Sequence, residues 1–347
     1  MTGTSAPSGG PVAGADPSAG AEGGGRAAGA DWRPTAGLDV LRLRARLAAR
    51  ARAFFAARGV LEVETPLLAA AATAEPHLAS LVVAGEPPRY LQTSPEFHMK
   101  RLLAAGSGPI YQLGRAFRGG EAGRRHNPEF TLLEWYRPGL DHHRLMDEVE
   151  ELLRALLPER IGPAPAPRTA YGELFRRQLG VDPHRATAAE LDRAIAAEDL
   201  SGPTFAPDDR DGRLQLLMAL AVEPRLPGGL VFVHEFPASQ ASLARVQRTE
   251  EGAVAERFEA FVDRVELANG FHELGDADEQ RRRFAADLAG RRAAGLPEPP
   301  LDERLLAALE VGLPDCAGVA LGFDRLVMLA AGAETIDEVL AFPAERA

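Results

Sequence analysis

The segment FRGGEAGRRHNPEF, residues 117–130, places a glycine-rich, cationic loop between two apolar runs. An arginine such as Arg118 can bind a phosphate through two parallel hydrogen bonds, and glycines let the backbone approach a ligand closely. Phe130 supplies an aromatic ring that can stack on a base. The segment therefore predicts a nucleotide-binding hairpin, with an ordinary exposed hairpin that has a charged tip as the alternative.

The segment VELANGFHEL, residues 265–274, holds two carboxylates, Glu266 and Glu273. Carboxylates can hold Mg²⁺ against a triphosphate, and they can also bind the ammonium group of a substrate. Because the two residues are seven positions apart, they can converge only if the strand bends or bulges near Gly270. A strand with solvent-facing acids is the alternative.

The segment GVALGFDR, residues 318–325, predicts a strand that leads into a helix. Asp324 is the expected N-cap, and Arg325 lies in the first turn, where the helix dipole disfavours a cation. An anion beside Arg325 would explain this placement, and Gly322 would let a ligand approach the end of the strand. A salt bridge from Arg325 to Asp324 or Glu334 is the alternative.

Composition restricts the functions that these segments can serve. The chain has 347 residues and a formal net charge of −11, which argues against broad, non-specific binding to nucleic acid. Its single cysteine excludes an internal disulfide framework, and no apolar run approaches the ~20 residues of a membrane helix. The first residues lack the basic and apolar regions of a secretory signal. We therefore expect a cytoplasmic protein with no role in a membrane.

The rest of the sequence predicts the elements that position these segments. Residues 1–36 are mostly Gly, Ala, Ser and Pro, which predicts a disordered tail before one domain over 37–347. Helices are expected over 38–58, 94–106, 140–157, 170–222, 277–295 and 302–311, with Ser94 as the N-cap of the second. Strands are expected over 110–118 and 129–137, and again in LVFVHEFPA and around FVDRVELANGF. Hairpins between groups of helices predict an α+β fold with a mainly antiparallel sheet flanked by helices.

Together these segments resemble the signature of the class II aminoacyl-tRNA synthetases. The helix and strand over 38–66 are similar to the first motif, which builds the dimer interface in that class. The pattern FR…HNPEF…E is similar to the second motif, and GVALGFDR to the third. Longer strings resemble the family of freestanding lysyl-tRNA synthetase paralogues that modify elongation factor P. These strings are LQTSPEFHMKRLL, RRHNPEFTLLEWYRP, FPASQASLAR, ELANGFHEL and GLPDCAGVALGFDRLVML, and the resemblance runs from residue 38 to the C-terminus.

The resemblance implies a homodimeric ligase that uses ATP and Mg²⁺ in two steps. A lysine-type amino acid, (R)-β-lysine in this family, attacks the α-phosphate of ATP and forms an aminoacyl-adenylate with release of pyrophosphate. The ε-amino group of one lysine on elongation factor P then takes the acyl group and forms an amide. Charge stabilisation and positioning suffice for this chemistry, so no general base is expected.

The resemblance also implies roles for individual residues. Arg118 and Arg325 are the expected catalytic residues, Arg118 at the α-phosphate and the substrate carboxylate and Arg325 at the triphosphate tail. The amino acid is expected to contact Ser94, Pro95, Glu96, Tyr136, Glu273 and Ala320. ATP is expected to contact Arg118, Gly120, Glu121, His126, Asn127, Phe130, Glu266, Leu267, Gly322 and Arg325. Glu266 and Glu273 are the expected carboxylates at Mg²⁺.

Three features depart from the lysyl-tRNA synthetases themselves. Only about 37 tail-like residues precede the first motif, too few for an anticodon-binding barrel, so no binding of a tRNA anticodon is expected. Ala320 stands where those synthetases have glycine, and one methyl group discriminates modestly between lysine backbones. The second motif has Gly120 where a glutamate contacts the adenine amino group. Glu121, one residue later, is expected to replace that glutamate, with a backbone contact as the alternative.

Two other functions fit the same residues. One is a truncated synthetase that charges another carrier protein or a small molecule. The other is a catalytically silent dimer that senses an amino acid, against which the intact Arg118, Glu266, Glu273 and Arg325 argue. The sequence leaves both the acceptor and the preference between α-lysine and (R)-β-lysine open.

Overall fold

The computed structural model describes residues 32–249 and 252–347. Residues Pro34–Ala347 form one compact unit, and every element below lies within it. The predicted disordered tail, residues 1–36, falls mostly outside the described residues, so the tail stays a prediction. Among the described residues, no helix is long and apolar enough to cross a membrane.

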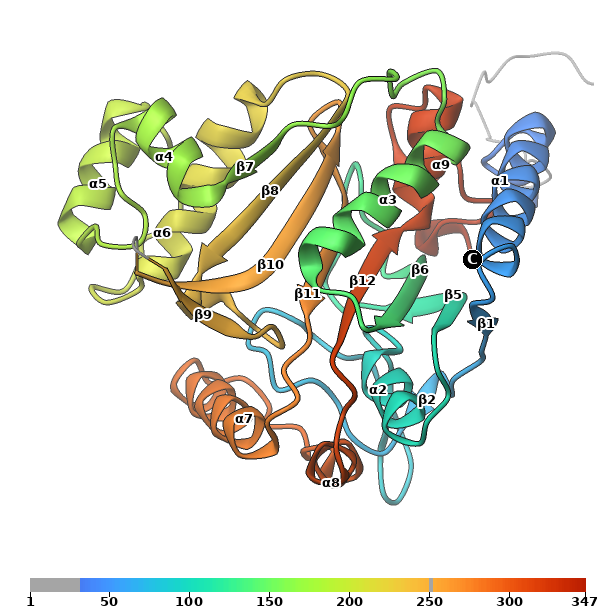
Figure 1. The fold of residues 1–347 in the computed structure, drawn as a ribbon, viewed down its shortest axis with the longest axis horizontal. Helices are drawn as coiled ribbons and strands as arrows, with labels where there is room; N and C mark the ends of the chain where they lie inside the picture. Colours follow the sequence, from blue (N-terminus) through green and yellow to red (C-terminus); the bar gives the residue numbers. More distant parts are fainter. Residues whose placement is uncertain (1–31, 250–251) are drawn as a thin grey trace, which may run out of the picture. The chain divides into compact units, whose positions relative to one another are not determined.

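A nine-stranded sheet forms the centre of the unit (Figure 1), in the order β1-β5-β6-β12-β11-β10-β8-β7 with β9 paired to β10. Within it, β1–β5 and β7–β8 are parallel and the other described pairs are antiparallel. The predicted α+β fold with a mainly antiparallel sheet is therefore confirmed. The strands are β1 (Leu61–Glu62), β5 (Ile110–Phe117), β6 (Glu129–Pro138), β7 (Arg168–Ala170), β8 (Leu230–Pro237), β9 (Val246–Thr249), β10 (Gly252–Val262), β11 (Val265–His272) and β12 (Cys316–Gly322). A separate three-stranded sheet contains β2 (Leu68–Ala69), β3 (Val82–Val83) and β4 (Arg89–Leu91).

The helices agree with the predicted segments except in one region. They are α1 (Leu38–Ala56), α2 (Glu96–Ala104), α3 (His142–Leu156), α4 (Tyr171–Leu179), α5 (Ala188–Ala197), α6 (Arg210–Leu217), α7 (Ala277–Ala293), α8 (Glu303–Val311) and α9 (Phe323–Ala331). The single helical segment expected over 170–222 is divided into α4, α5, α6 and a π-helical turn, Met218–Val222. Gly180 ends α4 with a φ of 68°, and Pro183 and Pro203 lie in the connections, where their rings disfavour a continuous helix.

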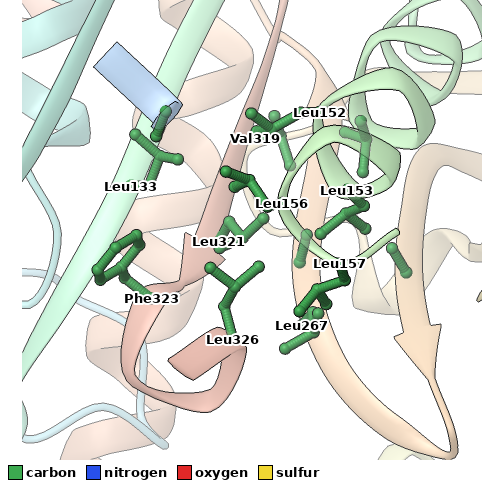
Figure 2. Close-up of a cluster of buried hydrophobic side chains, with 14 of the residues drawn as sticks. Leu133, Leu152, Leu153, Leu156, Leu157, Leu267, Val319, Leu321, Phe323 and Leu326 are labelled. Carbon is green, nitrogen blue, oxygen red and sulfur yellow. The ribbon is translucent and has the colours of Figure 1, made fainter. Parts of the chain in front are cut away.

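Helices α1, α3 and α9 pack on one face of the sheet, which we call the core face. Figure 2 shows leucines of α3, Leu152 and Leu156 among them, together with Val319 and Leu321 of β12. Leucines three or four positions apart share one side of a helix, which explains how α3 covers the sheet. Asp141 begins this helix by accepting a hydrogen bond from the Arg144 N–H at 2.8 Å.

Alternate side chains of the same strands point to the opposite face, which we call the site face. Trp135 of β6 lies in the core-face cluster, whereas Tyr136 packs with Met99 and Leu103 of α2. Consecutive side chains of β6 thus lie on opposite faces of the sheet, as expected for a strand. Helices α4, α5 and α6 cover another part of the sheet with a core of their own.

Strand β11 has an irregularity that decides which of its side chains reach the site face. Its pairing with β10 shifts register between Ala260 and Phe261, which leaves Leu267 as an extra residue on β11. Leu267 lies in the core-face cluster, and the bulge brings Glu266 to the site face. The sequence predicted a bend near Gly270, whereas the structure places it three residues earlier.

The prediction that Asp324 caps α9 is wrong. The N-cap is Gly322, and the buried Asp324 carboxylate instead accepts hydrogen bonds from the Thr131 N–H and the Arg44 guanidinium, both at 2.6 Å. These two bonds join α9 to β6 and α1. They fix the start of the helix, and with it the position of Arg325.

Candidate active site

Two cavities meet on the site face of the sheet. The larger, of about 250 Å³, lies between α2 and strands β6, β11 and β12, and we call it the acidic cavity. The smaller, of about 140 Å³, lies between the β5–β6 hairpin and the start of α9, and we call it the basic cavity. Arg118, Asn269 and Ala320 line both cavities. The structure thus brings the three predicted segments together, with Arg118 where the cavities meet.

Three charged side chains form a buried chain of ion pairs in the acidic cavity. The Lys100 ammonium nitrogen lies 2.7 Å from Glu96 Oε1 and 2.6 Å from Glu273 Oε2, and the Lys100 and Glu273 side chains are each 1% exposed. Burial by itself lowers the pKa of Lys100, but the two carboxylates overcome this effect and raise it. Burial raises the pKa of Glu273, and Lys100 opposes that shift. Lys100 therefore stays charged within the fold.

A third carboxylate, Glu134, completes the network. Its oxygens accept hydrogen bonds from Ser94 Oγ and from the Tyr136 hydroxyl, each at 2.8 Å. Burial, and then the charge of Glu96, raises the pKa of Glu134 to about 8. Three buried carboxylates thus lie close together with one ammonium group, which pairs with Glu96 and Glu273, and the network keeps a proton on Glu134 at neutral pH. A ligand with ammonium groups would remove the need for that proton.

The start of α2 differs by one residue from the prediction. Pro95, not Ser94, is the N-cap, although Ser94 Oγ still accepts a hydrogen bond from the Glu96 N–H at 3.0 Å. Ser94 and Glu96 line the acidic cavity, whereas Pro95 is not among its lining residues. Pro95 therefore shapes the turn that presents its two neighbours.

The loop of the β5–β6 hairpin places Arg118 beside an aromatic ring and a carboxylate. The guanidinium carbon of Arg118 lies 5.0 Å from the centroid of Phe130, and Nη1 lies 3.6 Å from Glu121 Oε1. Phe130 and Glu121 line the basic cavity, whereas Gly120 is not among its lining residues. Gly120 has a φ of 78°, a conformation that favours glycine. Of the two residues, Glu121 is the one at the cavity.

Arg325, in the first turn of α9, contacts residues of both other predicted segments, the β5–β6 hairpin and strand β11. Its Nη1 donates to the Glu266 backbone oxygen at 2.9 Å and lies 3.3 Å from Glu266 Oε2, and its Nη2 lies 2.5 Å from His126 Nε2. Burial, and then the charge of Arg325, lowers the pKa of His126, so a neutral ring accepts this hydrogen bond. The carboxylate partner of Arg325 is thus Glu266, in place of Asp324 or Glu334.

Three further predicted nucleotide residues line the basic cavity in different ways. Asn127 donates from Nδ2 to the Glu129 backbone oxygen at 2.6 Å and accepts at Oδ1 from the Ala344 N–H at 2.9 Å. Its amide therefore joins the hairpin to the C-terminal segment. Leu267 and Gly322 also line this cavity, at the bulge and at the end of β12.

The two carboxylates predicted to share Mg²⁺ are not brought together. Glu266 lines the basic cavity, whereas Glu273 lines the acidic cavity, where it pairs with Lys100. The Lys100 ammonium group is therefore already the cationic partner of Glu273. The structure therefore places Glu266 with the predicted nucleotide-binding residues and Glu273 with the predicted amino-acid-binding residues.

Two other carboxylates are the electrostatic neighbours of Glu266. Burial raises the pKa of Glu259 on β10; Arg257, at 2.6 Å, opposes the shift, and Glu266 and Glu223 add to it. Burial, and then Glu266, raises the pKa of Glu223 to about 7. The charge of Glu266 thus adds to the raised pKa of both neighbours, and carboxylates crowded in this way are stabilised when a divalent cation binds among them.

Sequence comparisons place this geometry in a family. The chain matches the model of the class II tRNA synthetases (D, K and N) over residues 28–346. Across 92% of its length it is 52% identical to the elongation factor P–(R)-β-lysine ligases of Yersinia enterocolitica and Proteus mirabilis, and it covers 99% of each. The protein of that name from Salmonella dublin is 51% identical with the same coverage. The chain belongs to the elongation factor P–(R)-β-lysine ligase family. The predicted resemblance is confirmed.

Several side chains of this ligase-family site were not predicted as site residues. Alternation along β6 placed Glu134 on the same face as Tyr136, and this signal could have identified it. Lys100 follows Glu96 by four positions on a helix, a spacing that brings the two side chains together. Gly318 also lines the acidic cavity, where an added Cβ would lie 2.3 Å from the Tyr136 ring and 2.5 Å from Glu273 Oε1. Asn269 and Glu259 were also missed.

The substitution Glu134→Gln is expected to stabilise the unliganded protein at pH 8 but not at pH 5. Between pH 4.5 and about 8, the unfolded chain loses the Glu134 proton while the folded chain keeps it. The free energy of unfolding of the wild type therefore falls as pH rises through this window. Glutamine has no such proton, so the melting temperature of the variant relative to wild type should rise from pH 5 to pH 8.

Differential scanning fluorimetry at pH 5, 6.5 and 8 measures this difference. Glu129→Gln is the matched control, because Glu129 begins the same strand with a side chain that is 51% exposed. Its melting temperature relative to wild type should be the same at each pH. A difference for Glu134→Gln that does not change with pH would contradict the assigned protonation.

Proposed function

We propose that the chain activates (R)-β-lysine with ATP and transfers it to elongation factor P, the activity for which its relatives are named. The observation that carries this proposal is the meeting of two unlike cavities at Arg118. The acidic cavity suits a substrate with ammonium groups, and the basic cavity suits a nucleotide. We expect the reaction to take place in the cytoplasm, with the translation factor as acceptor.

The first step joins the amino acid to AMP. A carboxylate oxygen of the amino acid attacks the α-phosphorus of ATP, the bond to the bridging oxygen of the β-phosphate breaks, and pyrophosphate leaves. The carboxylate and the phosphate repel each other, and Arg118 lies where both would meet. A guanidinium between the two anions would position them and stabilise the charge of the transition state.

The second step transfers the acyl group. The ε-amino nitrogen of a lysine on elongation factor P attacks the acyl carbon and loses a proton to solvent as the amide forms, and AMP leaves with the electrons of the broken bond. No general base is assigned among the described residues, since positioning and charge account for the chemistry.

The acidic cavity would select the amino acid by charge. Lys100 balances one of the three carboxylates, so the charge of the other two can be matched by the two ammonium groups of (R)-β-lysine. An amino acid with one ammonium group would leave a buried carboxylate unpaired, which is unfavourable. Ala320 lines both cavities, so its methyl group would contact the backbone of the substrate near the reacting carboxylate.

The basic cavity would hold ATP. Phe130 would stack on the adenine ring, and Glu121 would accept a hydrogen bond from the adenine amino group. Arg325 and His126, which contact each other, would bind the triphosphate tail. Gly322 would leave space for that tail at the end of β12.

Magnesium would bind where Glu266 lines this cavity, with the neighbouring Glu259 of β10 as a second ligand in place of the predicted pair with Glu273. The residues fit this ion, because the charge of Glu266 acts on the buried Glu259 and both carboxylates supply the hard oxygen atoms that Mg²⁺ prefers. When bound, the ion would neutralise charge on the triphosphate. Glu273 would then contribute only to binding of the amino acid and not to binding of Mg²⁺.

An exposed apolar surface lies beside the end of the first motif, and we propose that a second copy of the chain binds there. Leu68 and Val311 are exposed and line a cavity of about 700 Å³ beside α2 and α8. Val82 and Val83, in the same small sheet as Leu68, are exposed too. Exposed apolar side chains that gather in this way are typical of an interface.

Two substitutions should separate the sites kinetically. Glu96→Gln is expected to raise the KM for (R)-β-lysine by about 10–100-fold with little change in the KM for ATP, because one ammonium partner loses its charge. Arg325→Ala should have the opposite pattern. ATP–pyrophosphate exchange measures both, and each variant is the control for the other. Equal effects on both KM values in both variants would contradict two separate cavities.

Transfer is measured separately, as a gain in mass of purified elongation factor P that depends on the enzyme, ATP and (R)-β-lysine. Exchange accompanied by this gain supports the proposed acceptor. Exchange without any gain would indicate that the activated amino acid goes to a different carrier or small molecule.

The substitution Leu68→Glu should convert a dimer to a monomer, because it buries a charge in the proposed interface. Sedimentation velocity measures the change. Leu220→Glu is the matched control, since Leu220 is exposed to a similar degree (48%, against 45% for Leu68) but lies in the π-helical turn after α6. A wild-type chain that sediments as a monomer, or dissociation of both variants, would contradict the proposed interface.

A further inference from the structure

A group of histidines lies behind the acidic cavity. His272 ends β11 and directly precedes Glu273, and consecutive side chains of a strand point to opposite faces. His272 therefore points to the core face. Glu256 of β10 and His142, the first residue of α3, lie beside it, and the potential ligand atoms of the three are all within 4.8 Å of one another. The proposed ligase reaction uses none of these three side chains.

His142 has the properties of a side chain without its ligand. It is 3% exposed, and neither of its ring nitrogens has a hydrogen-bond partner among the described residues. Buried polar atoms are unfavourable without partners, so this ring requires an explanation. Burial, and then the charge of His143, lowers the pKa of His142 to about 4. The ring is therefore neutral, the form that binds metal ions.

His272 is oriented by a carboxylate on its far side. Its Nδ1 contacts a Glu256 oxygen, and its Nε2 lies 3.0 Å from Asp315 Oδ1. Arg245 Nη2 in turn lies 2.6 Å from the same Asp315 oxygen. Histidines that bind metals usually donate the other ring N–H to a carboxylate, which fixes the ring. Asp315 occupies that position and leaves Nδ1 directed at Glu256.

We propose that His142, Glu256 and His272 bind a divalent transition metal, and that zinc is the ion their donors suit best. Two imidazoles with one carboxylate are an established donor set for zinc, whereas Mg²⁺ and Ca²⁺ prefer oxygen ligands alone. Ligand atoms around tetrahedral zinc are roughly 3.4 Å apart, so side-chain movements on the order of 1 Å close the site.

The bound ion would join three elements of the fold. It would connect the first turn of α3 to β10 and β11, directly behind the strand that carries Glu273. Because the site lies on the core face, it is separate from the Mg²⁺ carboxylates proposed on the site face.

Zinc binding to the full-length chain tests the site. The protein is treated with EDTA, freed of chelator, loaded with zinc chloride and passed through gel filtration, after which bound zinc is counted by mass spectrometry. Affinity is measured by competition with a chromophoric chelator. We expect one zinc per chain and a higher melting temperature with zinc. His142→Asn and Glu256→Gln should each weaken binding at least about 100-fold and abolish the thermal shift.

Two matched variants locate the ion. His77→Asn removes an exposed histidine elsewhere, and Glu266→Gln removes a carboxylate of the basic cavity; both should keep the single zinc and its affinity. Circular dichroism of the metal-free proteins checks their folding, and Glu256→Gln serves if His142→Asn does not fold. The proposal is overturned if the wild type binds no zinc, if His142→Asn and Glu256→Gln bind it as tightly as wild type, or if Glu266→Gln alone abolishes binding.

Discussion

The site depends on a buried excess of negative charge. Glu96, Glu134 and Glu273 lie together with one ammonium group, that of Lys100, which pairs with Glu96 and Glu273, and little of any of these side chains reaches solvent. Buried charge is unfavourable unless it is paired, so the fold holds a network that a cationic ligand completes. Burial and this excess of negative charge raise the pKa of Glu134 to about 8. Without ligand, the protein therefore retains a proton at the place where the ligand would bring positive charge.

The central sheet allows this network to coexist with a stable core. Strands β6, β11 and β12 direct alternate side chains to the core face or to the cavities, so packing and chemistry occupy opposite faces. Strand β11 shows the division most clearly: its bulge at Leu267 brings Glu266 to the nucleotide side, and its last residues place His272 and Glu273 on opposite faces. One strand thereby contributes to the amino-acid cavity, the nucleotide cavity and the proposed metal site.

Much of this arrangement could be predicted from the sequence. The hairpin around Arg118, the helix after Ser94 and the mainly antiparallel sheet follow from local patterns that the structure keeps. Predictions were wrong where long-range contacts decide the outcome. The Asp324 carboxylate accepts hydrogen bonds from Thr131 and Arg44, which are distant in sequence. Glu273 pairs with Lys100 and lies apart from Glu266, with which it was predicted to share Mg²⁺. The spacing of residues in the sequence predicts neither the extra residue in β11 nor the distant side chain that pairs with a buried carboxylate.

The most direct test of the charge argument is the number of protons released when (R)-β-lysine binds. Calorimetry at pH 7, in buffers that differ in ionisation enthalpy, measures this number. If the ammonium groups of the substrate replace the proton of Glu134, about one proton should leave per bound molecule, because a group with a pKa of about 8 is mostly protonated at pH 7. Binding without proton release, or with proton uptake, would contradict the claim that a buried excess of carboxylates selects the substrate.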